Sequence, residues 1–103
     1  MTETPSHRRA KARAAGSGGQ TEMPLPGGRR LDALSAHGRA TEVERSGDPA
    51  ALREAARRLR DARASQRVLV VPQFDMSAAA DAMRDVGVRG TVKNIKGNRR
   101  KPV

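Results

Sequence analysis

Apolar residues recur at helical spacing in two segments of the chain. Within residues 47–66, Leu52, Ala55, Ala56 and Leu59 repeat every three or four positions, and arginines fill the opposite side. Asp48 suits the N-cap and the proline after it suits the first helical position, so a helix is predicted from there. A second helix is predicted after Asp75 as its cap and before Gly87, with an inner face of Met76, Ala79, Ala80, Met83 and Val86.

Shorter runs predict β-strands. The expected strands are TEMPL (21–25), RRLDALS (29–35), RATEVER (39–45), RVLVVP (67–72) and the weaker VRGTVKNI (88–95). Pro24 cannot donate to a ladder, so it confines the first strand to a sheet edge. The four consecutive apolar residues 68–71 suit a central strand that is buried on both faces.

The order of elements predicts an α/β fold. With a possible short helix over residues 7–15, the pattern is (α)βββαβαβ, in which a hairpin precedes a parallel pair joined by a crossover helix, giving a small mixed sheet. We expect a basic, flexible N-terminal segment at 1–20, a single α/β domain at 21–96 and a basic C-terminal tail at 97–103.

The composition limits the size of the hydrophobic core and bears on the cellular location of the protein. Phe74 is the only aromatic residue among 103, and much of the apolar content is alanine, so the core is expected to be thin and open to support from a partner or a second copy, as in a homodimer. The absence of cysteine excludes disulfides and thiolate sites. No leader-like or membrane-spanning apolar run occurs, so no membrane association and a cytoplasmic location are expected.

Positive charge is concentrated at the two ends. The net charge is +10; residues 1–20 hold four basic residues against one acidic residue, and residues 89–103 hold six basic residues and no acidic one. Such ends favour a polyanion, and nucleic acid is preferred, with DNA favoured over RNA. The predicted contacts are Arg8, Arg9, Lys11, Arg29, Arg30, Lys93, Lys96, Arg99, Arg100 and Lys101. The alternative is that these ends only confer solubility.

Three carboxylates lie on the two predicted strands 29–35 and 39–45, which form a hairpin. If Ala36-His37-Gly38 forms a three-residue loop with Gly38 left-handed, Asp32 lies directly opposite Glu42, and Glu44 lies two residues further along. A two-residue turn at 37–38 would instead place Asp32 on the other face from both glutamates. The chain alone leaves this choice open.

Carboxylates that crowd one place repel each other and gain from a divalent cation. Oxygen ligands suit Mg²⁺ or Mn²⁺, with water and a substrate phosphate completing the shell. Such an ion can activate a water and stabilise the charge that develops on a phosphodiester. Basic ends that bind a polyanion and an acidic centre that binds metal together indicate a nuclease.

The acidic residues of this hairpin and the elements that follow it resemble a known family of nucleases. Asp32, the Glu42-Val43-Glu44 run on the next strand, the helix from Asp48 and the strand at Val68 resemble the PD-(D/E)XK nuclease superfamily over residues 20–75. The resemblance implies a restriction-endonuclease-like fold, as in small Holliday-junction resolvases and toxin nuclease domains. It also implies metal-dependent endonuclease activity, with Asp32 and Glu42 as metal ligands.

Two positions depart from that family's pattern. The motif lysine falls at Glu44, where some restriction enzymes carry glutamate; here Glu44 is expected as a third catalytic group, either as a further metal ligand or as the group that orients the attacking water. The family's first-helix glutamate is missing, and Glu22 is the nearest substitute as a ligand. His7 has no partner in the sequence. The alternatives are an ordinary solvated hairpin whose acids are neutralised by nearby arginines, and a non-catalytic basic module that binds nucleic acid.

Overall fold

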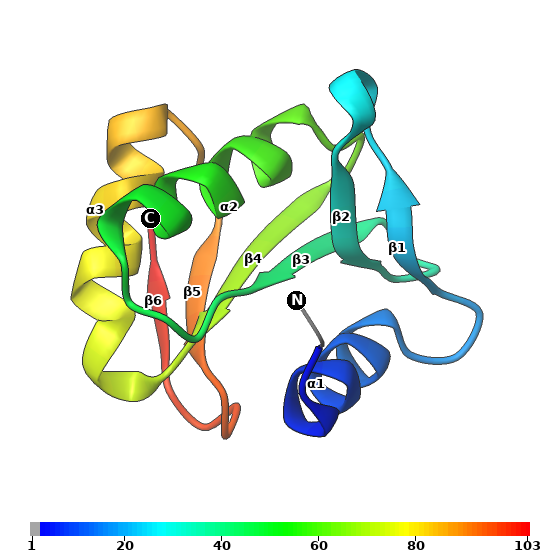
Figure 1. The fold of residues 1–103 in the computed structure, drawn as a ribbon, viewed down its shortest axis with the longest axis horizontal. Coiled ribbons are helices and arrows are strands. Elements are labelled where there is room, and N and C mark those ends of the chain that lie inside the picture. The colour runs from blue at the N-terminus through cyan, green and yellow to red at the C-terminus, as the bar shows by residue number, and fades with distance from the viewer. Residues whose placement is uncertain (1–2) are drawn as a thin grey trace.

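Six strands form one mixed sheet in which the spatial order follows the chain, from β1 to β6 (Figure 1). The computed structural model describes residues 3–103. The strands are β1 (Gln20–Pro24), β2 (Arg30–Leu34), β3 (Arg39–Val43), β4 (Gln66–Val71), β5 (Thr91–Asn94) and β6 (Arg100–Pro102). The first three form an antiparallel meander, β3, β4 and β5 are parallel, and β6 returns antiparallel to β5. The predicted small mixed α/β sheet is therefore confirmed.

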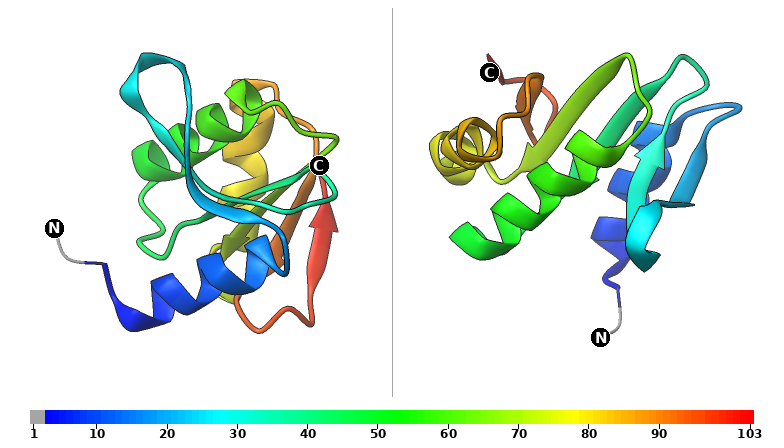
Figure 2. Two further views of the ribbon diagram at one scale, coloured as in Figure 1. Left: turned by 90° about the vertical axis from the view of Figure 1, so that its right-hand side faces the viewer. Right: turned by 90° about the horizontal axis from the view of Figure 1, so that it is seen from above.

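Helices cover both faces of this sheet. They are α1 (Pro5–Ala15), α2 (Pro49–Asp61) and α3 (Met76–Val86), with single 3₁₀ turns at Pro26–Gly28 and Gln73–Asp75. Seen from two directions, α2 and α3 lie on one face, while α1 crosses the other face (Figure 2). α1 packs mainly on β2 and β3, at the meander end of the sheet.

The predicted helix signals are found in α2. The Asp48 side chain accepts a hydrogen bond from the Ala51 N–H at 3.0 Å, which caps the first turn. Leu52 and Leu59 are fully buried on the inner face, as the periodicity predicts. α3 ends at Gly87, whose φ of +84° provides the left-handed cap. Asp75 occupies the N-cap position of α3, but its side chain makes no capping hydrogen bond.

The core lies between the sheet and the α2–α3 layer, and it holds no aromatic residue. Its largest fully buried apolar side chains are Leu31, Leu52, Leu59, Leu69, Met83, Val71 and Val92. The many small alanines let the helices lie close to the sheet. Phe74, in contrast, is 87% exposed.

Within residues 3–103, α1 and the last strand both pack against the body of the domain. α1 begins at Pro5, with Thr4 as its N-cap, and its Ala15 is buried. Residues 100–102, which lie in the expected C-terminal tail, form β6 and pair with β5 through Lys93 and Arg100. No helix within residues 3–103 is long and apolar enough to cross a membrane.

Candidate functional site: a buried carboxylate pair between two strands

The hairpin of β2 and β3 adopts the register with the three-residue loop. Ala33 pairs with Thr41 and Leu34 with Ala40, and the Ser35 N–H donates to the Arg39 carbonyl at 2.9 Å. Gly38 has a φ of +83°, as the loop requires. This register places Asp32 opposite Glu42, so of the two registers considered the three-residue loop is the one that forms.

Beyond Ala33 and Thr41 the regular ladder ends, and side chains replace backbone partners. The Asp32 N–H donates to Glu42 Oε2 at 2.7 Å, and the Val43 N–H donates to Asp32 Oδ2 at 2.8 Å. Each carboxylate therefore binds the backbone of the other's strand. The pair joins β2 to β3 where the strands part.

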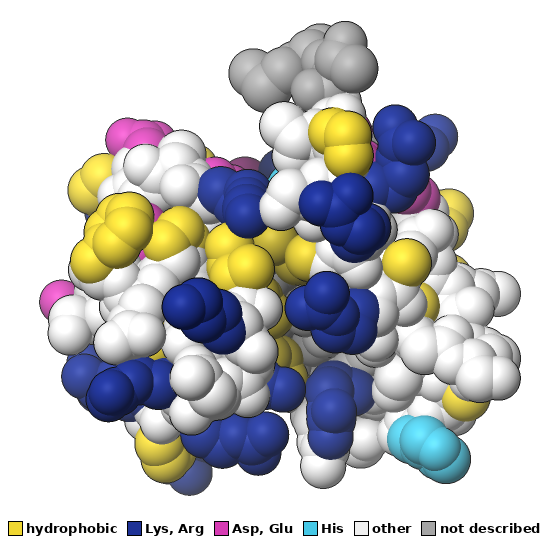
Figure 3. Space-filling view, turned by 90° about the horizontal axis from the view of Figure 1, so that it is seen from below, with side chains coloured by type: hydrophobic (Ala, Val, Ile, Leu, Met, Phe, Trp, Pro, Cys, Tyr) yellow, Lys and Arg dark blue, Asp and Glu magenta, His cyan; other side chains and the backbone are white. Residues whose placement is uncertain are grey.

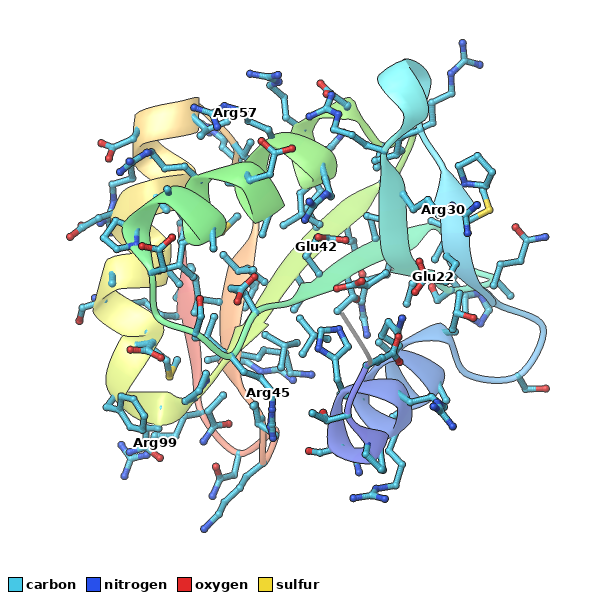
Figure 4. The ribbon with its side chains drawn as sticks, viewed as in Figure 1. Glu22, Arg30, Glu42, Arg45, Arg57 and Arg99 are labelled. Carbon is cyan, nitrogen blue, oxygen red and sulfur yellow. The ribbon has the colours of Figure 1, made fainter. Side chains whose placement is uncertain are left out.

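Glu42 is directed towards α2. Its side chain lies between β3 and α2 (Figure 4), it is 1% exposed, and its Oε1 is 3.2 Å from Arg58 Nη1. Burial, together with the negative charge of Asp32, raises the pKa of Glu42 to about 8. The hydrogen bonds from the Asp32 N–H and Arg58 only partly oppose this rise.

Asp32 lies beneath α1, so the two carboxylates do not project side by side from one face as expected. His7 Nε2 is 3.7 Å from Asp32 Oδ2. Burial raises the pKa of Asp32, although the Val43 N–H and the nearby His7 and Lys11 act in the opposite direction. Asp32 Oδ1 accepts no hydrogen bond from residues 3–103, and the side chain is 17% exposed. One oxygen of the pair therefore keeps open coordination.

Lys11 of α1 binds Glu22, the residue that the sequence suggested as a substitute metal ligand. Lys11 is 3% exposed, and its Nζ donates to Glu22 and to Glu3. Burial would lower the pKa of Lys11, but the bonds to these two carboxylates outweigh it and raise the pKa. Glu22 itself has a φ of +55°, which is strained for a residue with a side chain. It lies at the β1–β2 end of the sheet, near α1 (Figure 4).

Glu44 is not part of this group. It follows the end of β3, and its Oε1 accepts a hydrogen bond from the Ser46 N–H at 3.1 Å. Within residues 3–103, no set of three or more histidine, cysteine or acidic side chains is arranged to hold a metal ion. The structure thus brings together Asp32 and Glu42, joins Glu22 to Lys11 of α1, and leaves Glu44 outside.

The predicted nucleic-acid contacts are found in several places. Arg8 and Arg9 lie on α1, Arg30 is exposed on β2, and Arg29 pairs with Glu54 and Asp61 of the α2 segment. Lys11 is buried and bound to carboxylates, so in this structure it is not available to a phosphate. Lys93, Lys96 and Arg100 line a groove on the sheet face that bears α1, whereas Arg99 and Lys101 do not line it.

Sequence reasoning did not identify the α1 contribution to the site. His7 and Lys11 are four residues apart and therefore share one face of a helix, which was the available signal. Arg58 was likewise not assigned to Glu42, because that contact depends on how α2 packs on β3. No family model matches the chain, and no curated protein or solved structure matches it closely enough to indicate kinship.

Proposed function

We propose that this protein is a metal-dependent nuclease that hydrolyses phosphodiester bonds of nucleic acid, with DNA as the favoured substrate. The observation that carries the proposal is the juxtaposition of Asp32 and Glu42, two carboxylates with raised pKa values that lie between adjacent strands. Burying carboxylates without full neutralisation is unfavourable, and such groups concentrate at functional sites.

The arrangement of elements supports a restriction-endonuclease-like fold. A helix on one face, a three-stranded meander, a crossover helix on the other face and a parallel fourth strand follow each other in the order that the resemblance implies. In this arrangement, Asp32 lies on the second strand and Glu42 on the third. The missing motif lysine at Glu44 remains the main departure.

In this proposal, Asp32 and Glu42 are the residues that would hold a magnesium or manganese ion, with Oδ1 of Asp32 as the first ligand. Mg²⁺ is commonly bound by only one or two protein carboxylates, with water and substrate phosphate as the other ligands. Asp32 Oδ1 accepts no hydrogen bond from the part of the chain that the structure describes, and burial and the negative charge of Asp32 raise the pKa of Glu42 although Arg58 lies beside it. When bound, such an ion stabilises the charge that develops on a phosphodiester and activates a water.

The chain's own residues have distinct tasks in this proposal. Arg58 fixes the rotamer of Glu42 from the α2 side, and the reciprocal backbone bonds fix the spacing between Asp32 and Glu42. His7 lies 3.7 Å from Asp32 and is placed to exchange a proton near the reacting phosphate. Lys11 fixes the side chain of Glu22 against α1.

Cleavage assays test the proposal. Plasmid, single-stranded and branched DNA, and RNA are incubated with Mg²⁺ or Mn²⁺ and the wild-type protein, Asp32→Asn or Glu42→Gln. We expect cleavage that either substitution reduces by about 100-fold or more, because a metal ion contributes several kcal/mol to such reactions. Asp85→Asn, an exposed acid on α3, is the matched control and should cleave normally. Equal activity of Asp32→Asn and wild type would refute the assignment.

A non-catalytic nucleic-acid-binding module is the second candidate, and the groove lined by Lys93 and Arg100 favours it. In that case no substrate would be cut with either metal, and Asp32→Asn would bind nucleic acid as tightly as the wild-type protein does. Binding that depends on the basic residues would remain.

A further inference from the structure

A continuous groove runs between α1 and the β5–β6 hairpin, across the face of the sheet opposite to the core. Two adjoining cavities of about 420 and 170 Å³ make up this groove, and both are lined by Arg39, Val68 and Lys93. Ala10, Arg13 and Ala14 of α1 form one wall, and the segment 93–97 forms the other. Figure 3 shows Lys and Arg side chains on both sides of this hollow, with apolar side chains in it.

Strand alternation explains why the groove is basic. Ala40, Leu69 and Val92 point into the core, so their neighbours in the strands point to the opposite face. Those neighbours include Arg39 and Lys93, and Arg100 pairs with Lys93 in the register. Lys101 pairs with Val92 and therefore belongs to the other face. The basic C-terminal segment is thus divided between the two faces.

The groove is lined by basic residues and by no acidic one, although the Arg67 guanidinium itself donates to the Leu59 and Ala62 carbonyls at the end of α2. Its basic lining residues are Arg13, Arg39, Arg67, Arg89, Lys93, Lys96 and Arg100, and none of the 11 acidic residues of the chain lines it. None of these seven side chains forms an ion pair within residues 3–103. Burial lowers the pKa of Lys93, and the positive charges of Arg100 and Arg39 lower it further. Like charges held together in this way are unfavourable until an anion binds.

We infer that this groove binds the sugar–phosphate backbone of one nucleic-acid strand. Facing rows of cations suit a linear polyanion, since both walls can reach the same chain of phosphates. Because the groove is small, with cavities of about 420 and 170 Å³, we take a single strand and not a duplex as its occupant. The groove has no aromatic lining residue on which bases could stack, so binding is directed to the backbone and is independent of sequence.

This inference deepens the proposed function and rests on it in one respect, because the strand in the groove is taken to be the substrate of the nuclease. The two sites share α1: His7 and Lys11 lie towards Asp32, and Ala10 and Arg13 form the groove wall. α1 therefore contacts Asp32 on one side and the groove on the other, and neither Asp32 nor Glu42 lines the groove itself. The binding itself needs no metal.

The test measures fluorescence anisotropy of labelled single-stranded and duplex oligonucleotides, without divalent metal and in an Asp32→Asn background, so that cleavage does not affect the result. The groove variant combines Arg39→Gln, Lys93→Gln and Arg100→Gln. A charge-matched control combines Arg53→Gln, Arg63→Gln and Arg84→Gln, which lie outside the groove, on or directly after α2 and on α3. Thermal unfolding of both variants verifies that they fold.

We expect the groove variant to bind at least about 10-fold more weakly than the control, and its salt dependence to fall. Removing one phosphate interaction with a single strand reduces the slope of log K against log salt by about 0.7, so removing three reduces it by about 2. Oligonucleotides of different sequence should show the same weakening. Equal weakening of the groove and control variants would overturn the inference, as would weakened duplex binding with unchanged single-strand binding. Failure of cleavage alone would leave this result intact.

Discussion

Glu42 should make the free energy of unfolding decrease as the pH rises from about 5 to 8. Burial raises the pKa of Glu42 to about 8, against 4.5 in the unfolded chain. Between these values the folded protein binds more protons than the unfolded chain, so stability is lost as the pH rises through this window. Burial also raises the pKa of Asp32, so Asp32 changes the stability in the same direction.

The expected size of the effect is large for a small domain. One tenfold change in a proton equilibrium corresponds to about 1.36 kcal/mol, so Glu42 contributes up to about 5 kcal/mol between pH 4.5 and 8. Small domains have a total stability of about 5–15 kcal/mol. Glu3 and Asp61, whose pKa values are lowered by hydrogen bonds to basic partners, titrate below this window and do not compensate.

Urea unfolding followed by far-UV circular dichroism at pH 5, 6, 7 and 8.5 measures this dependence, since the chain has no Trp or Tyr to report it by fluorescence. Glu42→Gln keeps the shape of the side chain but cannot ionise. We expect that residue 42 no longer makes the free energy of unfolding of this variant depend on pH. At pH 8.5 the free energy of unfolding of the variant should exceed that of the wild type by up to about 4–5 kcal/mol.

A wild-type stability that is flat or increases between pH 5 and 8 would refute the reasoning, and so would a Glu42→Gln variant with an unchanged pH profile. The same titration carries a test of the metal site. A bound cation requires an ionised Glu42, so Mg²⁺ should stabilise the wild type at pH 8.5 more than at pH 6. NaCl at the same ionic strength is the control.

Three substitutions test the packing that positions the site, each by urea unfolding. Leu59→Ala removes a fully buried side chain of α2 and should lower the free energy of unfolding by about 2–5 kcal/mol; a decrease below about 1 kcal/mol would contradict a close-packed core at this position. Asp48→Ala removes the α2 cap and should cost about 1 kcal/mol, with Asp48→Asn as a variant that retains most of it. Gly90→Ala would place a Cβ 2.3 Å from the Arg67 carbonyl oxygen, so a decrease of about 1–3 kcal/mol is expected; unchanged stability would show that β4 and β5 are not this close.

Local signals were sufficient for most of the fold. The cap at Asp48, the spacing of Leu52 and Leu59, and Gly38 in its loop act within a few residues, and each predicted its element correctly. β6 was missed because a strand of three residues, Arg100–Pro102, has no apolar alternation of its own. It forms because β5 offers a partner edge.

Of the candidate site, only the positions of the two strand residues, Asp32 and Glu42, could be predicted from the sequence. The turn geometry determines that Asp32 and Glu42 are opposite each other, and the chain encodes that turn locally. The contacts of His7, Lys11 and Arg58 depend on how two helices dock on the sheet, which no local pattern specifies. The groove cations Arg39 and Lys93 could have been assigned to one face by alternation, once Ala40 and Val92 were recognised as core residues.

Both free edges of the sheet carry a proline. Pro24 is in β1 and Pro102 is in β6, the two outermost strands, and neither residue has an N–H to offer an incoming strand. Unprotected edges promote aggregation by adding strands from other molecules, a hazard for a protein with a thin, alanine-rich core. A proline in each edge strand removes one donor from that edge and so disfavours the extension of this sheet by a second copy of the chain.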